Sequence, residues 1–411
     1  MRHPLSLSLL LSAAAAGLTS CGAGETSSGD PTTTTRAECP PCVTDADCLT
    51  GESCGQFAGD SFCAPSCAQG QACAAGHTCT DVTTAEGAAV KLCVPITDVC
   101  GPPMSAGGSG GTGGSGGTGG AGGAMTTGGS GGGVTGIDGG TLDTLSFAIV
   151  GDTRPPLIDD TGGYPTSIVT KIWKDVESQS PKPAFAVATG DYMFAKPYGG
   201  EGTKQLDLYL TARANYTGTL FPAMGNHECT GATASNCGPS GADGTTKNYD
   251  VFMSKMLAPL GVDKPYYAVH VKAKDGSWTA KLVFVAANAW SSAQATWLKD
   301  TLSAPTTYTF VVRHEGDSAT TAPGVVPSMN IVHQHPFTIV IAGHTHKYDH
   351  YADSRQIIVG NGGAPLVGSG GYGYVIARQR PDGAIELKEH DYSSNSVKDT
   401  FAVKANGSAA P

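Results

Sequence analysis

The sequence contains no apolar run long enough to cross a membrane as a helix. Its longest, residues 5–18, has about 14 residues, whereas a spanning helix needs roughly 20. Positive charge is also scarce, because 25 Lys and Arg stand against 35 Asp and Glu and leave a net charge of −10. This balance argues against nucleic acid held on a basic patch. It still permits a phosphorylated substrate, since bound metal ions can supply positive charge locally.

The first 20 residues are typical of an export signal, because Arg2 and His3 precede the apolar run. The run ends in Leu-Thr-Ser-Cys21, which resembles the bacterial lipobox, where the signal is cut before a lipid-bearing cysteine. We therefore expect an extracytoplasmic protein of the cell envelope, anchored to a membrane through Cys21. Gly22 after this cysteine resembles proteins sent to the outer membrane of Gram-negative bacteria. An ordinary signal peptide with an incidental cysteine is the alternative.

Cysteine is unevenly distributed along the chain. Of the 13 Cys, ten lie within residues 39–100, two are Cys229 and Cys237, and Cys21 is left over. A lipid on Cys21 removes the odd thiol, and the other twelve can pair in an oxidising compartment. We expect Cys229 and Cys237 to close a small disulfide loop. Residues 39–100 have few large apolar side chains, so we expect disulfides to stabilise this module, and zinc binding at its first CxxC is less favoured.

Composition divides the rest of the chain into segments. Residues 21–38 are rich in Thr, Ser and Gly and are expected to form a flexible tether. Residues 101–141 hold much of the glycine in repeats such as GGSGGTGG, which is typical of a linker. Residues 142–405 are expected to form one large domain, since a segment of this length can bury a single core.

Within residues 142–405, short apolar runs alternate with amphipathic segments. Strands are predicted at residues 146–150, 184–188, 308–312, 338–342 and 356–359, helices at 165–178, 204–215 and 293–302, and hairpins at 266–287 and 372–390. Strands mixed with helices in this way predict an α/β fold in which two sheets form a sandwich flanked by helices.

Five short motifs follow predicted strands, and each places a polar side chain where a strand ends. They are Gly151-Asp152-Thr153-Arg154, Gly190-Asp191-Tyr192-Met193-Phe194, Gly225-Asn226-His227-Glu228, Val311-Val312-Arg313-His314 and Gly343-His344-Thr345-His346. A glycine at a strand end lets the chain turn tightly and presents the next side chain at the rim of the sheet. Carboxylates, an amide oxygen and imidazoles together suit two divalent or trivalent ions such as Fe, Mn or Zn.

This set of motifs resembles the calcineurin-like metallophosphoesterases, and within them it is similar to the purple acid phosphatases. The resemblance covers residues 146–390 and implies their αββα fold, with Asp191 bridging two ions. It further implies that Asp152 and His346 hold the first ion and that Asn226, His314 and His344 hold the second. By the same resemblance His227 lies over the site as a donor to phosphate or to the leaving group, and Glu228 orients His227.

Two positions depart from the family pattern. Many relatives have a histidine ligand where this chain has Arg154, and purple acid phosphatases have an iron-binding tyrosine where it has Phe194. Neither arginine nor phenylalanine is an ordinary metal ligand. We therefore expect weaker metal binding at the first site and no tyrosinate-to-iron colour. Arg154 has two possible roles that the sequence does not separate, namely contact with phosphate through its planar fork or pairing with an acidic neighbour.

The resemblance implies a lipid-anchored hydrolase of phosphate monoesters or diesters, acting through attack of a metal-bridging hydroxide. The expected partner is a phosphorylated small molecule or surface group, and a nucleic acid is not expected. An alternative of another class is a surface-binding or adhesion lipoprotein with a degenerate phosphoesterase domain. Arg154 and Phe194 favour that alternative, whereas the intact set of metal-ligating residues favours the enzyme.

Overall fold

The computed structural model describes residues 42, 45–57, 60–67, 72–74, 77–84, 88–95, 136–232, 234–317, 319, 322–351 and 355–411. The predicted export signal, the lipid-bearing Cys21, the tether and nearly all of the predicted linker lie outside these residues. Within the described ranges, none of the helices has both the length and the apolar character needed to cross a membrane.

The Cys-rich module contains a four-stranded antiparallel sheet in the order β2-β1-β3-β4. Its strands are β1 (Glu52–Phe57), β2 (Asp60–Pro65), β3 (His77–Thr84) and β4 (Ala89–Pro95), preceded by a 3-10 turn at Asp45–Asp47. Among the described residues of the module, four disulfides connect it, Cys42–Cys54, Cys48–Cys63, Cys67–Cys79 and Cys73–Cys93. Its apolar core consists mainly of four buried side chains, Ala64, Val82, Leu92 and Val94. The expectation of disulfides in place of a large core is confirmed for the cysteines described.

The larger part of the chain contains a six-stranded sheet in the order β17-β16-β15-β6-β7-β8. Its strands are β6 (Ser146–Val150), β7 (Phe185–Ala188), β8 (Thr219–Pro222), β15 (Gly373–Gln379), β16 (Ile385–Asp391) and β17 (Val397–Val403). Strands β6, β7 and β8 run parallel to one another, so their carboxyl ends lie at one edge of the sheet. The predicted hairpin of β15 and β16 is present.

A seven-stranded sheet has the order β13-β14-β12-β11-β10-β9-β5. Its strands are β5 (Ile137–Leu142), β9 (Tyr267–Ala273), β10 (Thr279–Val285), β11 (Tyr308–Arg313), β12 (Ile339–Ala342), β13 (Tyr348–Tyr351) and β14 (Gln356–Val359). Strands β10, β11, β12 and β14 are parallel, and β9 and β10 form the predicted hairpin. Most residues of β5 belong to the segment that composition assigns to the linker.

Side-chain alternation explains how the two sheets pack. On β10, Leu282 and Phe284 join the core that both sheets share, whereas Val283 and Val285 join a second core beneath helices. The inner faces meet directly, since the rings of Phe147 on β6 and Phe310 on β11 pack edge to face at 5.2 Å. The sandwich predicted from the sequence is therefore present.

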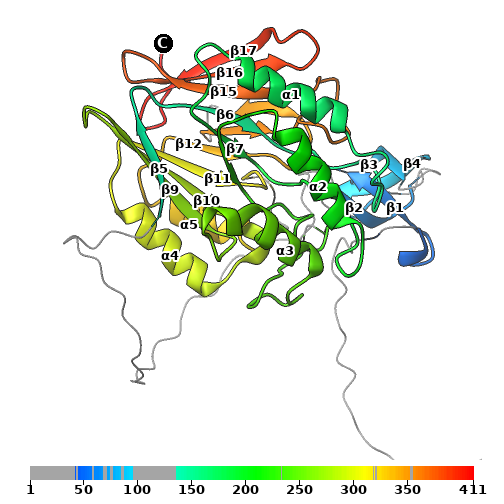
Figure 1. Cartoon of the computed structure of the whole chain (residues 1–411). Helices are drawn as coiled ribbons and strands as arrows, with labels where there is room; N and C mark the ends of the chain where they lie inside the picture. The colour runs from blue at the N-terminus through cyan, green and yellow to red at the C-terminus, as the bar shows by residue number, and fades with distance from the viewer. Residues whose placement is uncertain are drawn as a thin grey trace, which may run out of the picture. The chain divides into compact units, whose positions relative to one another are not determined.

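Helices cover the outer faces of both sheets. Figure 1 shows α1 (Thr166–Ser178) and α2 (Gly202–Arg213) over the six-stranded sheet, and α4 (Ser292–Ser303) and α5 (Val325–Val332) over the seven-stranded sheet. The buried side of α1 carries Val169, Ile172 and Val176 at helical spacing. A further helix, α3 (Lys247–Phe252), continues into a π-helical turn over Met253–Leu257. Two layers of helices around two sheets are the αββα arrangement that the family resemblance implies.

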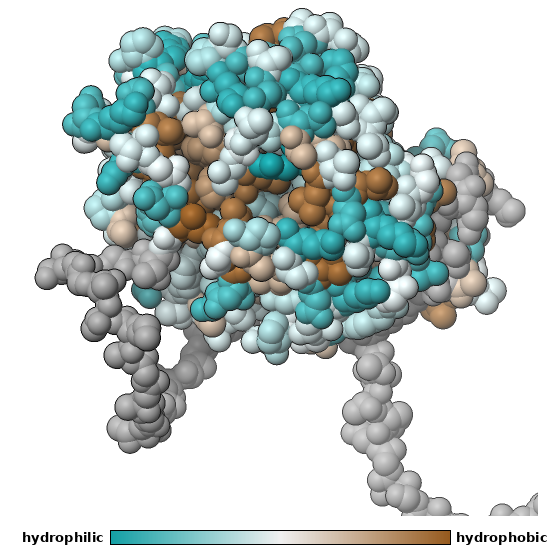
Figure 2. Space-filling view, in the orientation of Figure 1, coloured by the Kyte–Doolittle hydropathy of each residue, from teal (hydrophilic) through white to brown (hydrophobic). Residues whose placement is uncertain are grey.

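The edge strand β17 is polar on its outer side. Lys398 is exposed, and polar residues prevail in Figure 2 where β16 and β17 lie, whereas apolar residues gather in the middle of that view. A charged edge strand disfavours pairing with a second sheet.

Candidate metal centre

Seven side chains from five strand ends meet at the carboxyl edges of the two sheets. β6 leads to Asp152, β7 to Asp191, β8 to Asn226 and His227, β11 to His314, and β12 to His344 and His346. None of the seven is more than 4% exposed. The gathering expected from the sequence is therefore found, and the roles of the individual side chains stay predictions.

The backbone at this edge adopts conformations that non-glycine residues rarely take. The φ angle is 54° at Asp152, 58° at Asp191, 72° at His344 and 46° at His346. Such left-handed residues cost free energy and persist where the surrounding structure holds them, often at functional sites.

The glycines before these residues allow close approach of the strand ends. A Cβ atom on Gly225 would collide with Asp191 Oδ1, and one on Gly343 would collide with Asp152 Oδ2. This steric limit accounts for the recurrence of glycine in the motifs.

One group of donors converges around His314. Its Nε2 lies 3.0 Å from Asn226 Oδ1, 3.2 Å from Asp191 Oδ1 and 3.2 Å from His344 Nδ1. Its Nδ1 lies 2.8 Å from the carbonyl of Thr189, which fixes the ring orientation and leaves Nε2 facing the other donors. We call this group the His314 half-site, and its oxygen and nitrogen donors fit one transition-metal ion.

A second group of donors consists of Asp152, Asp191 and His346, whose ligand atoms all lie within 4.8 Å of one another. Asp152 accepts hydrogen bonds from the backbone N–H of His344, at 3.0 Å to each carboxylate oxygen. His346 Nδ1 lies 2.9 Å from the carbonyl of Pro365, so its Nε2 faces Asp152 Oδ1 at 3.6 Å. We call this group the Asp152 half-site, and its donor types also fit a metal ion.

Burial dominates the electrostatics of these groups. It raises the pKa of Asp152 to about 8, although His314 and His344 act in the opposite direction. Burial also acts to raise the pKa of Asp191, but His314, His227 and Arg154 outweigh it and hold that pKa well below its usual range. Burial and the nearby Arg154 lower the pKa of His346 well below its usual value. Two deeply buried carboxylates this close together are best stabilised by positive charge between them.

His227 lies beside these donors without joining either half-site. Its Nε2 is 3.7 Å from Asp191 Oδ2, and neither ring nitrogen has a hydrogen-bond partner among the described residues. The ring packs edge to face on Phe194 at 4.5 Å. Burial lowers the pKa of His227 well below its usual value, and a neutral imidazole still has one N–H to donate.

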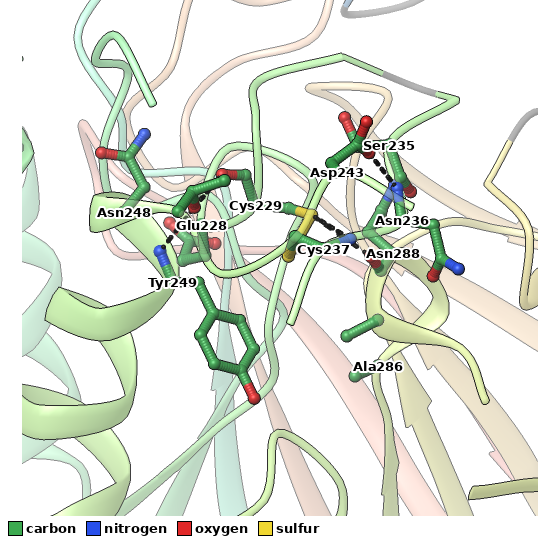
Figure 3. The surroundings of a disulfide bond; sticks show 12 residues. Glu228, Cys229, Ser235, Asn236, Cys237, Asp243, Asn248, Tyr249, Ala286 and Asn288 are labelled. Carbon is green, nitrogen blue, oxygen red and sulfur yellow. Dashed lines mark hydrogen bonds between the residues drawn. A yellow bond between two sulfur atoms is a disulfide. The ribbon is translucent and has the colours of Figure 1, made fainter. Parts of the chain in front are cut away.

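The loop after His227 is closed by the disulfide Cys229–Cys237, as expected from the sequence (Figure 3). The backbone N–H of Cys237 donates to the carbonyl of Asn288 at 2.8 Å, and Thr246 Oγ1 donates to the carbonyl of Cys229 at 2.6 Å. The disulfide and these bonds tie the loop that follows Asn226 and His227 to the segment after β10 and to the beginning of α3.

Among the described residues no hydrogen bond joins Glu228 to the His227 ring, so the role of orienting this histidine stays a prediction. Its carboxylate accepts three backbone hydrogen bonds, from Asp191 and Tyr192 at 2.8 Å each and from Gly225 at 2.9 Å. Burial and the charge of Asp191 raise the pKa of Glu228 to about 7. Since the carboxylate bonds to backbone beside Asp191, Glu228 positions the carboxylate shared by the two half-sites.

Arg154 and Phe194, the two departures from the family pattern, contact each other. The Arg154 guanidinium lies over the Phe194 ring at 4.5 Å from its centroid, in cation–π geometry. Its Nε lies 3.6 Å from Asp191 Oδ2. Pairing with an acidic residue, one of the two roles left open by the sequence, is thus observed, and the acidic residue is Asp191.

Sequence reasoning missed three features of this centre. The carbonyls of Thr189 and Pro365 orient His314 and His346, and no residue type signals such a backbone role. Glu315, next to His314, is buried with no hydrogen-bond partner for its carboxylate among the described residues, and burial raises its pKa. An acidic residue directly after a histidine motif is the one signal that could have drawn attention to it.

The sequence profile described as calcineurin-like phosphoesterase matches residues 145–348. No curated protein matches the chain in sequence.

Three solved structures illustrate the structural similarities. GAP50, the anchor in the inner membrane complex of Plasmodium, has 15% identity and a TM-score of 0.46, with 65% of this chain and 90% of that chain covered. Purple acid phosphatase PPD1 from yellow lupin (Lupinus luteus) seeds has 14% identity and a TM-score of 0.46, with 65% and 55% covered. A putative 5'-nucleotidase from Staphylococcus aureus has 12% identity and a TM-score of 0.34, with 64% and 54% covered.

Proposed function

Residues 145–348 belong to the calcineurin-like phosphoesterases, and from this membership we propose that the chain is a metal-dependent hydrolase of phosphate monoesters or diesters. The observation that carries the proposal is the meeting of two carboxylates, an amide oxygen and three imidazoles at the strand ends. Family membership implies divalent metal ions. Bound ions supply Lewis acidity toward phosphoryl oxygens and lower the pKa of a coordinated water. In our proposal the residues that would hold metal are Asp191 with Asp152 and His346 on one side and Asn226, His314 and His344 on the other.

The chain's own residues have distinct roles in this proposal. His227 donates its N–H to a phosphate oxygen or to the departing alcohol, a role supported by two buried ring nitrogens without hydrogen-bond partners among the described residues. Arg154, whose guanidinium is stacked on the Phe194 ring, donates hydrogen bonds to phosphate oxygens through its planar fork. Glu228 holds the backbone of Asp191 in place. Burial of the whole set excludes water and strengthens each of these interactions.

We also propose that the protein is exported and held by a lipid on Cys21 at the outer membrane of a Gram-negative cell envelope. The support is the amino-terminal sequence together with five disulfides among the described residues, which are typical of an oxidising compartment. The substrate is then a phosphorylated small molecule or surface group outside the cytoplasm.

The test uses the full chain, stripped of metal and resupplied with Mn, Zn or Fe. Metal content is measured by elemental analysis, and turnover is followed with p-nitrophenyl phosphate as monoester and bis(p-nitrophenyl) phosphate as diester. We expect turnover with at least one substrate that requires added metal, and loss of both metal and turnover in Asp191→Asn. Absence of bound metal and of turnover under every condition would overturn the proposal and favour the surface-binding alternative.

A further inference from the structure

Arg154 is fixed at the edge of the Asp152 half-site. The residue is 5% exposed, and its guanidinium stacks on Phe194 at 4.5 Å. Its Nη1 donates to the carbonyl of Pro155 at 3.3 Å, and its Nε lies 3.6 Å from Asp191 Oδ2. Contacts on three sides of the guanidinium leave the charge little freedom to move away from Asp191.

The two oxygens of Asp191 face different neighbours. Oδ1 lies 3.2 Å from His314 Nε2 and accepts the backbone N–H of His227 at 3.2 Å. Oδ2 faces Arg154 Nε at 3.6 Å and His227 Nε2 at 3.7 Å. The oxygen that faces the His314 half-site is therefore distinct from the oxygen that faces the guanidinium.

The distances place a fixed positive charge close to any ion in the Asp152 half-site. A metal–carboxylate bond is about 2.0–2.2 Å long, so an ion on Asp191 Oδ2 would lie within about 6 Å of Arg154 Nε. Two positive charges that close in a buried site repel each other strongly. The His314 half-site meets Asp191 through Oδ1 and is the less affected of the two.

Charge balance points in the same direction. One divalent ion and one guanidinium bring three positive charges to the carboxylates of Asp152 and Asp191, whereas two ions and the guanidinium bring five. Buried charges are stable only when they are compensated by opposite charges. The arrangement with one ion leaves the smaller excess of positive charge and is therefore favoured. Arg154 and Phe194 also leave the Asp152 half-site with fewer ligands, because neither a guanidinium nor a phenyl ring has a lone pair to offer a metal.

We propose that the protein binds one metal ion tightly, in the His314 half-site, and that the Arg154 guanidinium, held on Phe194, takes the electrostatic place of the second ion. The inference rests on the proposed function, and it makes Arg154 and Phe194 one functional unit. A substrate phosphate is then bound between one ion and one arginine fork, and not between two ions.

The experiment counts manganese in the metal-stripped full chain after dialysis against limiting Mn²⁺. We expect one Mn²⁺ per chain by elemental analysis and an isolated-ion signal in electron paramagnetic resonance. Arg154→His supplies an imidazole and removes the charge, so we expect two ions and the signal of an exchange-coupled pair. The matched control is Arg380→His, at a partly exposed arginine paired with Asp382, and the number of manganese ions bound to this variant should stay at one.

A second variant keeps the test decisive if Arg154→His does not fold, as judged by circular dichroism. Arg154→Gln removes the charge and adds no imidazole, and we expect it to tighten binding of the second ion by at least about tenfold. Two coupled ions in the unmodified chain, or a single ion in a folded Arg154→His, overturns the inference. Two ions together with metal-dependent turnover overturns the inference alone, whereas no ions and no turnover overturns the proposed function as well.

Discussion

At the scale of single residues, the side chains of the centre are of two kinds. Some can bind a metal ion, and others hold a neighbouring residue in place or donate a hydrogen bond. We expect His227 to belong to the second kind, because its ring lies beside the donors and packs on Phe194, and its nitrogens form no hydrogen bond among the described residues. Glu228 also belongs there, since its carboxylate bonds only to backbone N–H groups in those ranges. Substitution of His227 should therefore change turnover, whereas substitution of Glu228 should change metal affinity and stability.

Replacing His227 with alanine should lower kcat by about 10²–10⁴-fold, the range for loss of a proton-donating group, while metal content stays unchanged. Steady-state kinetics and elemental analysis of the same preparation check this. His333→Ala, at an exposed histidine after α5, is the control and should change neither quantity. Loss of metal from His227→Ala would show that the ring is a ligand.

Replacing Glu228 with glutamine should weaken metal binding and lower the free energy of unfolding by about 1–3 kcal/mol. The reason is that an amide cannot accept all three backbone hydrogen bonds without turning its NH2 group toward a donor. Urea denaturation and Mn²⁺ titration measure the two effects. Glu386→Gln, on the partly exposed pair with Lys388, should change stability by less than about 1 kcal/mol. Unaltered metal affinity in Glu228→Gln would contradict its positioning of Asp191.

At the scale of secondary-structure elements, local sequence predicted the long, apolar strands and the amphipathic helices well. Strand β6 begins and ends where its apolar run does, and α1 differs from the prediction by one residue. Short or polar elements were missed, among them β8, β13 and α5. β13 has the sequence Tyr-Asp-His-Tyr, without apolar alternation, and pairs with β14 because the turn after β12 brings it alongside. Its structure comes from pairing with a neighbour and not from propensity.

The carbonyls at the end of helix α4 accept hydrogen bonds from a buried lysine on a neighbouring strand, which supports a prediction at this scale. Lys281 on β10 donates to the carbonyls of Thr301, Leu302 and Ala304. Lys281→Met leaves these carbonyls at the end of α4 without their partner, so the free energy of unfolding should fall by about 1–3 kcal/mol. Lys272→Met, at an exposed lysine on β9, is the control and should have little effect.

The same lysine makes stability depend on pH. Burial lowers the pKa of Lys281 to about 8 from its ordinary 10.5. Between these values the unfolded chain holds the proton more often than the folded chain, so this residue makes stability rise as pH increases through that window. Urea denaturation at several pH values should show this rise in the unmodified protein and a smaller one in Lys281→Met. If the free energy of unfolding rose equally with pH in the unmodified protein and in Lys281→Met, Lys281 would not be the residue responsible for this pH dependence.

At the scale of the whole molecule, the chain combines a disulfide-stabilised module, a Gly-rich segment and a phosphoesterase domain behind an export-type sequence. Cys21→Ala should abolish lipid attachment, because the thiol is the proposed site of the lipid. Metabolic labelling with radioactive palmitate in a Gram-negative host measures this. Ser20→Ala keeps a small residue before the cysteine, and its labelling should equal that of the unmodified chain. Labelling that persists in Cys21→Ala would rule out the proposed anchor.

The sequence by itself determined the set of chemical groups at the centre and the order in which they occur. This was possible because each motif joins a strand, a glycine and a polar residue that are neighbours along the chain. It also determined the Cys229–Cys237 pair, since the two cysteines are eight positions apart and no other cysteine is nearby in the sequence.

Only the tertiary structure decided what each group contacts. Glu228 binds the backbone of Asp191, Arg154 stacks on Phe194, and the carbonyls of Thr189 and Pro365 orient two histidines. The physical reason is that these partners are backbone atoms or side chains from distant strands. Every residue carries the same backbone groups, so the choice among them depends on which strand ends the fold brings together.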